Sequence, residues 1–511
     1  MNMMRGFFTV GLWTLVSRVL GFLRDVLIAG ALGSSPVAEA FVIAFSIPNL
    51  FRRFFAEGAF NIAFVPIFSK KLEANDAPKD FARDAFSMLA AILIVFSFCA
   101  TLAMPALVWI MASGFVGDER FDLTVVFGRI AFPYILFISL AALASGVLNS
   151  TGRFVAAAAA PVLLNLAFIG ALLLCHWLDW NVGMTLACTV PVAGVAQLAF
   201  VWHAAHKAGF TLIPKIPRIT PDLKRLAIIA LPAVLAGGVV QINLIVGRQI
   251  ASGFEGANAW LYYADRLYQL PLGVVGIAVG IVLLPDLSRR LRSGDAQGGK
   301  DAFNRAAEFS LLLTIPSAVA LFIIPGVFVS VLFERGEFLA SDTASTAMAT
   351  AIYGLGLPAF VLQKIYQPVF FAREDTKSPF YFALLALIVN ATIAIGLRPY
   401  IGFTAAAYGA TFAGWAMLFC LWWGSQKFGD AAQLDERLRS KIGRIIVASL
   451  IMGVTIWTVA EAVKPILEMS GYRVLALCVI LFFGLVSYCV SGYITGAFTL
   501  WELRQMMRKN R

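Results

Sequence analysis

The stretch FFTVGLWTLVSRVLGFLRDVLIAGAL, at residues 7–32, combines a long apolar run with buried positive charge. It is long enough to cross the ~30 Å hydrocarbon core of a bilayer, which needs about 20 residues of helix. Arg18 and Arg24 interrupt it, so it lacks the uninterrupted apolar run of a cleavable signal peptide. We therefore predict a first membrane span, near residues 6–32, that carries positive charge within the bilayer.

The composition of the whole chain is typical of a membrane protein. Of its 511 residues, 60% are hydrophobic and 14% are charged, whereas soluble proteins are about 45–50% apolar and about 25% charged. The same composition excludes a disordered, collagen-like, coiled-coil or disulfide-scaffold protein. Six cysteines without CxxC spacing and three histidines without a nearby Cys or Glu partner predict no metal site.

Further apolar segments follow along the chain and predict an all-α polytopic membrane protein with about 14 transmembrane helices. The connections between these segments are short, which leaves no room for an extramembrane catalytic domain. The other predicted spans lie near residues 41–68, 85–113, 125–149, 155–175, 182–203, 226–251, 260–287, 306–333, 344–371, 379–397, 403–423, 445–463 and 473–501.

The formal net charge of +11 is distributed unevenly between the two sides of these spans. One set of alternate connections, together with both termini, holds 27 Lys and Arg residues, whereas the opposite set holds five. Cytoplasmic connections of membrane proteins are enriched in Lys and Arg. We therefore predict that both termini are cytoplasmic. One missed or invented span would break the alternation, so the bias also supports the number of spans.

Two pairs of similar segments indicate an internal repeat. FVPIFSKKL (64–72) aligns with LLPDLSRRL (283–291), and further on Asn165 aligns with Asn390. Apolar helices can match by chance, but two matches in the same order at nearly the same displacement favour duplication. Six spans per unit is an even number, so the two halves would share one orientation in the membrane. The predicted domains are an N-terminal lobe at 1–210, a C-terminal lobe at 211–430 and two extra spans at 431–511.

Eight basic residues remain inside the predicted spans. Each would cost about 2.5–3.5 kcal/mol at a lipid-facing helix centre, and eight would cost roughly 20–28 kcal/mol, more than the ~5–15 kcal/mol net stability of a typical domain. Most must therefore face a water-filled cavity or an acidic partner. Because acidic residues in or beside spans are fewer, we predict a cavity that binds an anion. The eight are Arg18, Arg24, Arg52, Arg53, Arg129, Arg248, Arg266 and Lys364.

In the first half of the chain, helical spacing separates structural charges from candidate functional ones. Arg53 and Glu57 are four residues apart, which favours a structural ion pair. Arg52 points about 100° away from Arg53 and is the better candidate for the cavity. Asp25 lies seven residues from Arg18 on the same helix face, so we expect it to neutralise Arg18 in part.

In the second half, Lys364 has no acidic neighbour within one helical turn, which favours a functional role. Arg266 directly follows Asp265, so half of an ion pair is an alternative to a cavity position. Spacing alone leaves the roles of Arg129 and Arg248 open.

Several longer motifs resemble one known family. They are SRVLGFLRD (17–25), PNLFRRFFAEGAFNIAFVPIF (48–68), YYADRLYQLPLGVVGIAVG (262–280), FPYILFISLAALASGVLNSTGRF (132–154) and AREDTKSP (372–379). Over essentially its whole length the chain is similar to the MurJ (MviN) family, the lipid II flippases of the bacterial envelope. That family belongs to the multidrug/oligosaccharidyl-lipid/polysaccharide exporter superfamily.

The resemblance implies two six-helix lobes around a central cationic cavity, with spans 13 and 14 forming a groove for a polyprenyl tail. Glu39 stands where relatives often carry Asp. The resemblance implies that the cavity is lined by Arg18, Arg24, Arg52, Arg266 and Lys364. Supporting or structural charges are expected at Asp25, Glu39, Arg53, Glu57 and Asp265.

No cofactor and no metal site are predicted, and ion coupling stays open. Some relatives are thought to bind sodium through carboxylates of the second lobe. Here spans 7 and 11 carry Asn243 and Asn390 but no carboxylate, so the sequence does not decide sodium coupling. An inside-negative membrane potential would favour outward movement of an anion in either case.

The resemblance implies a multi-pass inner-membrane transporter rather than an enzyme. Its expected role is to flip lipid II, an undecaprenyl-diphosphate-linked muropeptide, to the outer leaflet by alternating access, in peptidoglycan biosynthesis, cell wall biogenesis and cell shape. An exporter of another polyprenyl-diphosphate-linked oligosaccharide is the alternative. Expected partners are lipid II and membrane lipids, without nucleic acid. The protein is expected to be a monomer, and contacts with cell-wall synthesis proteins stay open.

Overall fold

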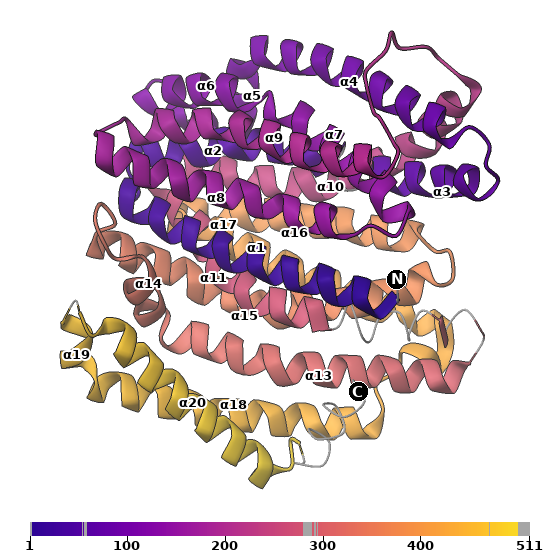
Figure 1. The fold of residues 1–511 in the computed structure, drawn as a ribbon. Coiled ribbons are helices and arrows are strands. Elements are labelled where there is room, and N and C mark those ends of the chain that lie inside the picture. Colours follow the sequence, from indigo (N-terminus) through magenta and orange to yellow (C-terminus); the bar gives the residue numbers. More distant parts are fainter. Residues whose placement is uncertain are drawn as a thin grey trace. The chain divides into compact units, whose positions relative to one another are not determined.

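The computed structural model describes residues 3–53, 55, 59–278, 289–290, 293, 295–469 and 471–498, and every regular element within them is helical. This confirms the predicted all-α fold. The chain divides into two compact units (Figure 1). The first comprises Met1–Ala259 with Arg335–Phe338, and the second comprises Trp260–Glu334 with Leu339–Arg511.

The helices of the first unit are long and mostly begin with a polar cap or a proline. Ser35 caps α2 by accepting a hydrogen bond from the N–H of Ala38, and Thr220 caps α10 through the N–H of Leu223. The helices are α1 (Met3–Leu32), α2 (Pro36–Arg52), α3 (Ala59–Glu73), α4 (Pro78–Leu102), α5 (Met104–Ala112), α6 (Glu119–Ala131), α7 (Tyr134–Ser150), α8 (Val155–Leu178), α9 (Val182–Lys207) and α10 (Pro221–Ser252), with the 3-10 turn η2 (Ser113–Phe115).

Packing in the first unit brings distant parts of the sequence together. Helix α1 packs on α8, α8 and α7 pack on α9, and α10 packs on α3 and α5. Fully buried aromatic side chains such as Phe64, Phe68 and Phe132 fill its core.

A tight backbone crossing explains why residues 335–338 belong to the first unit. The N–H of Glu337 donates to the carbonyl oxygen of Gly30 at 2.9 Å. Gly33 and Gly336 flank this crossing with φ of +57° each, a conformation that favours glycine. A Cβ at Gly33 would lie 2.2 Å from the carbonyl oxygen of Glu337, so no other residue fits there without displacing the backbone.

The second unit has its own core, around Phe303, Phe370 and Ile445. Helix α13 packs on α15 and α18, α17 packs on α15 and α16, and α18 packs on α20. Its elements are α11 (Ala257–Ala278), α13 (Ala296–Ile323), α14 (Pro325–Phe333), α15 (Ala340–Phe371), α16 (Lys377–Ile401), α17 (Thr404–Ser425), η4 (Gln426–Ala432), α18 (Glu436–Ala462), α19 (Lys464–Glu468) and α20 (Arg473–Thr495).

Some helix boundaries recur at a constant displacement along the chain. Helices α5 and α14 have nine residues each, carry a proline in the first turn, and follow the long helices α4 and α13. The segment Glu119–Ser150, formed by α6 and α7, and helix α15 span 32 residues each. In both pairs the second member begins 221 residues after the first. This displacement lies between those of the two sequence matches, as expected for a duplicated unit.

Ten helical segments in the described part of the chain are long and apolar enough to cross a membrane, and all ten coincide with predicted spans. The other four predicted spans, 6–32, 41–68, 226–251 and 260–287, correspond to α1, α2–α3, α10 and α11. Each of these four contains residues whose backbone or side chains lie outside the described set.

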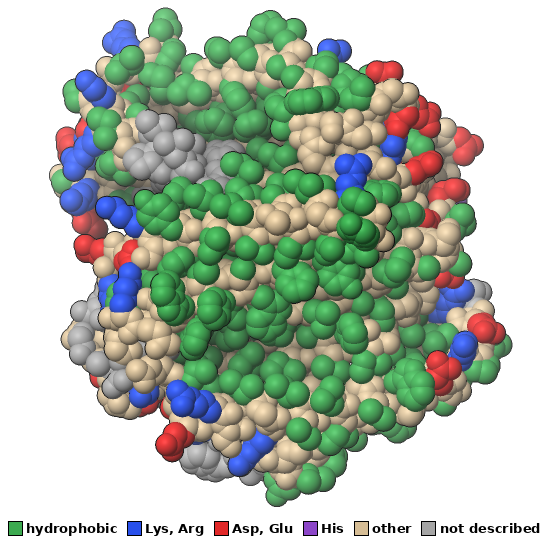
Figure 2. All heavy atoms as spheres, turned by 180° about the vertical axis from the view of Figure 1, so that it is seen from behind, with side chains coloured by type: hydrophobic (Ala, Val, Ile, Leu, Met, Phe, Trp, Pro, Cys, Tyr) green, Lys and Arg blue, Asp and Glu red, His purple; other side chains and the backbone are tan. Residues whose placement is uncertain are grey.

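The surface agrees with a membrane-embedded chain. Figure 2 shows a face covered mainly by hydrophobic side chains, with most charged side chains gathered at its two edges. Exposed apolar residues such as Phe98, Trp177 and Phe482 belong to different helices. Such a broad apolar surface would be unusual for a soluble monomer, whereas lipid tails would cover it in a bilayer.

The compact units divide the chain differently from the repeat. Helix α10, the seventh predicted span, packs within the first unit although its sequence position opens the second half. The predicted lobes at 1–210 and 211–430 and the addition at 431–511 describe the duplication and stay a prediction.

Candidate functional site

Arg18 stands near the middle of α1, and its side chain is exposed. Thirty residues of helix extend ~45 Å, so the middle of α1 lies at the depth of the hydrocarbon core. The exposed neighbours on this helix, Leu15 and Val19, are apolar. No hydrogen bond or ion pair joins Arg18 to another residue in the described part of the chain. The position therefore presents an exposed cation at a depth where lipid contact is costly.

Arg24 has a different environment, although it lies on the same helix. Its side chain is buried, and its Nη2 and Nε donate to Asp25 Oδ1 at 2.7 and 3.0 Å. Its Nη1 donates to Asn165 Oδ1 on α8 at 3.0 Å. Asn165 in turn donates from Nδ2 to the carbonyl oxygen of Ser17 at 2.8 Å, which ties α8 to α1.

The expected partner of Asp25 was wrong. Asp25 bonds the adjacent Arg24 rather than Arg18. Arg18 is two helical turns, about 10 Å, away along α1, and its side chain is exposed whereas Asp25 is buried. Asp25 is therefore not the ion-pair partner of Arg18.

Aromatic residues complete the surroundings of Arg24. The ring of Phe168, one turn after Asn165 on α8, lies 5.6 Å from the Arg24 guanidinium carbon. Phe168 meets Phe41 and Phe45 of α2 edge-on, at 6.0 and 5.6 Å between ring centroids. The guanidinium is thus held on one side by polar groups and on another by an aromatic wedge between α8 and α2.

The end of α2 carries the next two basic residues. Arg52 is half-buried, and Arg53, which follows as the C-cap, is exposed. The preceding Phe51 packs against Phe96 and Phe132 and anchors this end of α2 in the core. The predicted ion pair of Arg53 with Glu57 lies outside the described residues, because Glu57 is not among them.

Glu39 is fully buried in the first turn of α2. One carboxylate oxygen accepts from Arg120 Nη1 and from the N–H of Gly256, both at 2.9 Å, and the other accepts from the N–H of Asn258 at 3.0 Å. Arg120 also donates to Asp118 Oδ2. In the sequence, Arg120 lies in the connection between the predicted spans 85–113 and 125–149. Its only sequence signal was the neighbouring Asp118, because Glu39 lies 81 residues away along the chain.

The candidates of the second unit lie on α11 and α15. The Arg266 guanidinium carbon lies 4.5 Å above the ring of Tyr262, one turn earlier on α11. Asp265 accepts a hydrogen bond from Gln269. On α15, Gln363 donates to the carbonyl oxygen of Gly414 of α17 at 2.7 Å, whereas the next residue, Lys364, is exposed.

The AREDTKSP motif forms the turn between α15 and α16. Asp375 accepts from the ammonium of Lys427 at 2.7 Å and from the N–H and hydroxyl of Ser378 at 3.0 and 2.7 Å. The Lys427 ammonium, together with the Ser378 donors, lowers the pKa of Asp375 to about 2. The motif therefore has a structural role in the second unit, since its Asp375 joins this turn to η4, which follows α17.

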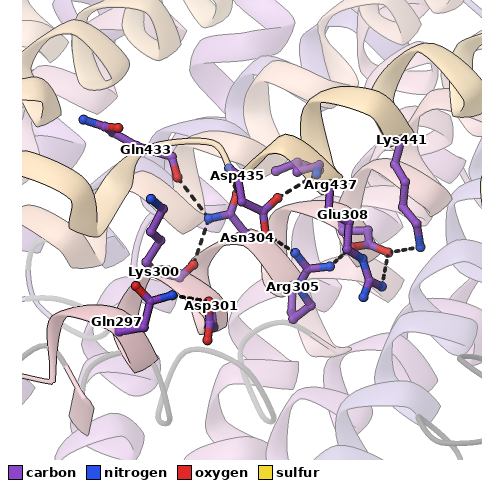
Figure 3. A network of polar contacts seen from close by, with 11 residues as sticks. Gln297, Lys300, Asp301, Asn304, Arg305, Glu308, Gln433, Asp435, Arg437 and Lys441 are labelled. Carbon is purple, nitrogen blue, oxygen red and sulfur yellow. Dashed lines mark hydrogen bonds and ion pairs between the residues drawn. The ribbon is translucent and has the colours of Figure 1, made fainter.

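A buried carboxylate that sequence analysis did not single out lies between α13 and α18. Glu308 has a side chain only 1% exposed, and it accepts from Lys441 Nζ at 2.6 Å and from Arg437 Nη2 at 3.0 Å. Arg305 bridges Glu308 and Asp435 with its two terminal nitrogens. Figure 3 shows these side chains converging from α13 and from the start of α18.

The described residues hold no group of three or more His, Cys, Asp or Glu side chains that could bind a metal ion. The predicted cavity residues are distributed over helices α1, α2, α11 and α15. Arg18 and Lys364 are exposed, Arg52 and Arg266 are half-buried, and Arg24 is buried. Their grouping in one cavity stays a prediction.

Curated relatives match most or all of the chain. A probable lipid II flippase MurJ of Rhizobium tropici is 44% identical over 522 residues, which cover 100% of this chain and 98% of the relative. The lipid II flippase MurJ of Burkholderia cenocepacia is 40% identical over 399 residues, with 76% of this chain and 77% of the relative covered.

Solved structures of the same fold are more distant in sequence. A lipid II flippase MurJ in an inward closed conformation superposes with a TM-score of 0.80 at 23% identity, over 95% of this chain and 98% of that one. An inward-facing multidrug resistance MATE transporter of the MOP superfamily superposes with a TM-score of 0.69 at 13% identity, over 83% and 98%. These likenesses confirm the predicted fold.

The family model described as lipid II flippase MurJ matches residues 28–475, which is most of the chain. Its members are transporters, which confirms the expectation that the chain is not an enzyme. The protein is accordingly a multi-pass membrane protein that belongs to the MurJ family of lipid II flippases.

Proposed function

We propose that this protein moves lipid II from the cytoplasmic to the outer leaflet of the inner membrane by alternating access, as a monomer. The substrate headgroup is held by Arg18, Arg24, Arg52, Arg266 and Lys364. The relatives that match the full chain carry the name lipid II flippase, which supports the substrate. The observation that carries the mechanism is the exposed Arg18 at the middle of α1.

The chemistry of the headgroup fits these side chains. A diphosphate that entered the bilayer alone would lose its hydration, at several kcal/mol per charge. A guanidinium offers a planar fork that matches two phosphate oxygens. Arg18 has no carboxylate partner in the described part of the chain, so a phosphate group can supply the missing anion.

Arg24 contributes a pre-oriented guanidinium. Asp25, Asn165 and Phe168 hold it in one orientation, so little conformational freedom is lost when an anion approaches. Asp25 offsets its charge in part, which limits the energetic cost of an arginine buried inside the first unit.

The orientation of the chain follows from its charges. The excess of Lys and Arg on one side of the spans supports cytoplasmic termini. An inside-negative potential would then favour outward movement of the anionic headgroup by about 2.3 kcal/mol per charge per 100 mV. The hairpin of α18 and α20 exposes apolar residues such as Val454, Trp457 and Leu485, which supports its role as the groove for the polyprenyl tail.

The test places a carboxylate beside Arg18. In Thr14→Glu, a glutamate one turn before Arg18 has the favourable i,i+4 orientation for an ion pair. We expect Thr14→Glu and Arg18→Ala to fail to complement a flippase-depleted strain and to accumulate lipid II on the cytoplasmic side. Thr14→Gln is the matched control of the same size, and Arg153→Ala, in an exposed loop, removes a charge elsewhere.

Both control variants are expected to complement. Normal lipid II translocation by Thr14→Glu and by Arg18→Ala, at wild-type protein levels, would refute the role of Arg18. Accumulation of a different lipid-linked oligosaccharide, with lipid II unchanged, would show that the substrate is wrong.

A further inference from the structure

The connection between α9 and α10 has a regular three-residue pattern. Within the sequence LIPKIPRITP (212–221), Ile213, Ile216 and Ile219 are spaced by three, and Pro214 and Pro217 follow the first two. Proline fixes its own φ and restricts the preceding residue to extended conformations. A polyproline II segment has three residues per turn, so this spacing predicts that the three isoleucines share one face. We call residues 211–220 the linker segment.

The beginning of the linker segment is anchored in the first unit. Leu212 and the preceding Phe210 are buried, and the Phe210 ring meets Phe68 edge-on at 5.6 Å. The indole N–H of Trp202 donates to the carbonyl oxygen of Leu212 at 3.1 Å. No helix or strand forms from Phe210 to Thr220, where α10 is capped.

The isoleucines beyond this anchor are largely exposed. Ile213, Ile216 and Ile219 are 57%, 82% and 83% exposed. Ile216 and Ile219 are more exposed than the apolar residues on the lipid-facing helices named above, such as Phe98 and Trp177. Three isoleucines held on one face would be unfavourable in bulk water.

The depth of the linker segment follows from its contacts with α4. The N–H of Lys215 donates to Ser87 Oγ at 3.0 Å, and the Lys215 ammonium pairs with Asp84. Asp84 and Ser87 lie where the apolar part of α4 begins, because the predicted span starts at residue 85. The contacts therefore hold the linker segment beside the start of the apolar part of α4, where we infer the boundary between water and hydrocarbon to lie.

Exposed cations accompany the isoleucines. Arg218 lies within the linker segment, and Lys207, Lys224 and Arg225 lie at its ends, all exposed. The nearby carboxylates already have basic partners, since Asp84 pairs with Lys215 and Asp222 pairs with Lys71. The surface thus offers apolar side chains and uncompensated positive charge at headgroup depth.

We propose that the linker segment is a membrane-surface strap that inserts Ile213, Ile216 and Ile219 among the headgroups of anionic phospholipids, with Arg218 contacting their phosphates. The strap anchors the connection between the two repeats to the leaflet at which α9 ends and α10 begins. This interaction surface does not depend on the substrate proposed above, because it rests on a different part of the chain.

Hydrogen–deuterium exchange of the full-length protein in nanodiscs tests the proposal. We compare phosphatidylcholine alone with a mixture of phosphatidylcholine and phosphatidylglycerol. The amides of residues 213–219 are expected to exchange at least threefold more slowly in the anionic bilayer. In the triple variant Ile213→Ser, Ile216→Ser and Ile219→Ser, this protection is expected to disappear while the exchange of α9 and α10 stays unchanged.

A matched pair of charge variants separates the role of Arg218 from the general charge of the linker segment. Arg218→Gln is expected to remove most of the difference between the two bilayers, whereas Lys215→Gln removes less, because its ammonium already pairs with Asp84. Equal exchange in both bilayers, or unchanged protection in the triple variant, would overturn the proposal. Protection that arises only after addition of a cell extract would assign the surface to a protein partner and overturn it as well.

Discussion

The substitution Glu308→Gln tests how the α18–α20 hairpin is fastened to the rest of the second unit. Glu308 of α13 accepts from Lys441 and Arg437 of α18. Glutamine has nearly the same shape but no charge, so the substitution leaves three basic side chains around a neutral amide. The effect on stability therefore measures the charge of Glu308 rather than its packing.

The loss of stability in Glu308→Gln depends on which of the three basic side chains can reach water. Breaking a buried ion pair costs ~3–5 kcal/mol. Arg305 and Arg437 have side chains 30% and 45% exposed and can turn outward, whereas that of Lys441 is only 8% exposed. We therefore expect the lower end of the range, ~3 kcal/mol. For an unfolding unit of about 250 residues, this lowers Tm by roughly 6–12 °C.

The assay is thermal unfolding of the purified full-length protein in detergent, arranged as a double-mutant cycle. Lys441→Met removes the buried cation, and Glu308→Gln/Lys441→Met removes both charges. The double variant is expected to lose ~1–3 kcal/mol less than the sum of the single losses. Arg439→Met, an exposed position on the same helix, is the control and should change stability by less than ~0.5 kcal/mol. Additive losses in the cycle would refute the buried pair.

Two further substitutions probe the first unit and the AREDTKSP turn. Asn165→Leu removes the acceptor of Arg24 Nη1, so we expect a loss of ~1–3 kcal/mol in thermal unfolding and slower lipid II flipping, whereas retained flipping and stability would contradict the role of Asn165. Asp375→Asn removes the carboxylate that pairs with Lys427. The pKa of Asp375 is about 2 in the folded protein and ~3.9 in the unfolded chain. The contribution of this carboxylate to the free energy of unfolding is therefore present above the unfolded pKa and is lost as the pH falls through the folded pKa. The Tm difference between wild type and Asp375→Asn should stay constant from neutral pH to about pH 5 and shrink only at lower pH; a difference that shrinks at neutral pH would contradict the assigned pKa.

The fold could be predicted largely from the sequence because apolar length and charge position are local properties. A run of about 20 apolar residues in lipid must be helical, since every backbone group needs an internal partner there. The repeat was visible for the same reason, because Pro66 and Pro285 lie in matching local sequences. The packing of the helices could be predicted less well from the sequence. No sequence feature indicated that α10 packs within the first unit.

The partners of the charged residues could be predicted only in part. Spacing along one helix suggested Arg18 as the partner of Asp25, but burial decided in favour of Arg24. The partners Asn165 of Arg24 and Glu39 of Arg120 are separated by 141 and 81 residues. Glu308 was missed although it lies within a predicted span, because its partners Arg437 and Lys441 were counted as loop cations.

The described basic residues of the two units fall into two classes. Arg24, Arg120 and Lys441 are each nearly buried and each meets a carboxylate within its own unit. The pairs of Arg120 and Lys441 each join two helices, whereas Arg24 pairs with the adjacent Asp25 of α1, and all three pairs form without substrate. A residue that binds a transported anion needs the opposite property, since a permanent carboxylate partner would compete with the phosphate. Among the described residues, Arg18 meets this condition, being exposed at mid-helix without such a partner. The contrast with Arg24, one and a half turns further along α1, supports the proposal that Arg18 makes the most direct contact with the headgroup, with Arg24 adding a guanidinium whose orientation Asp25 and Asn165 fix.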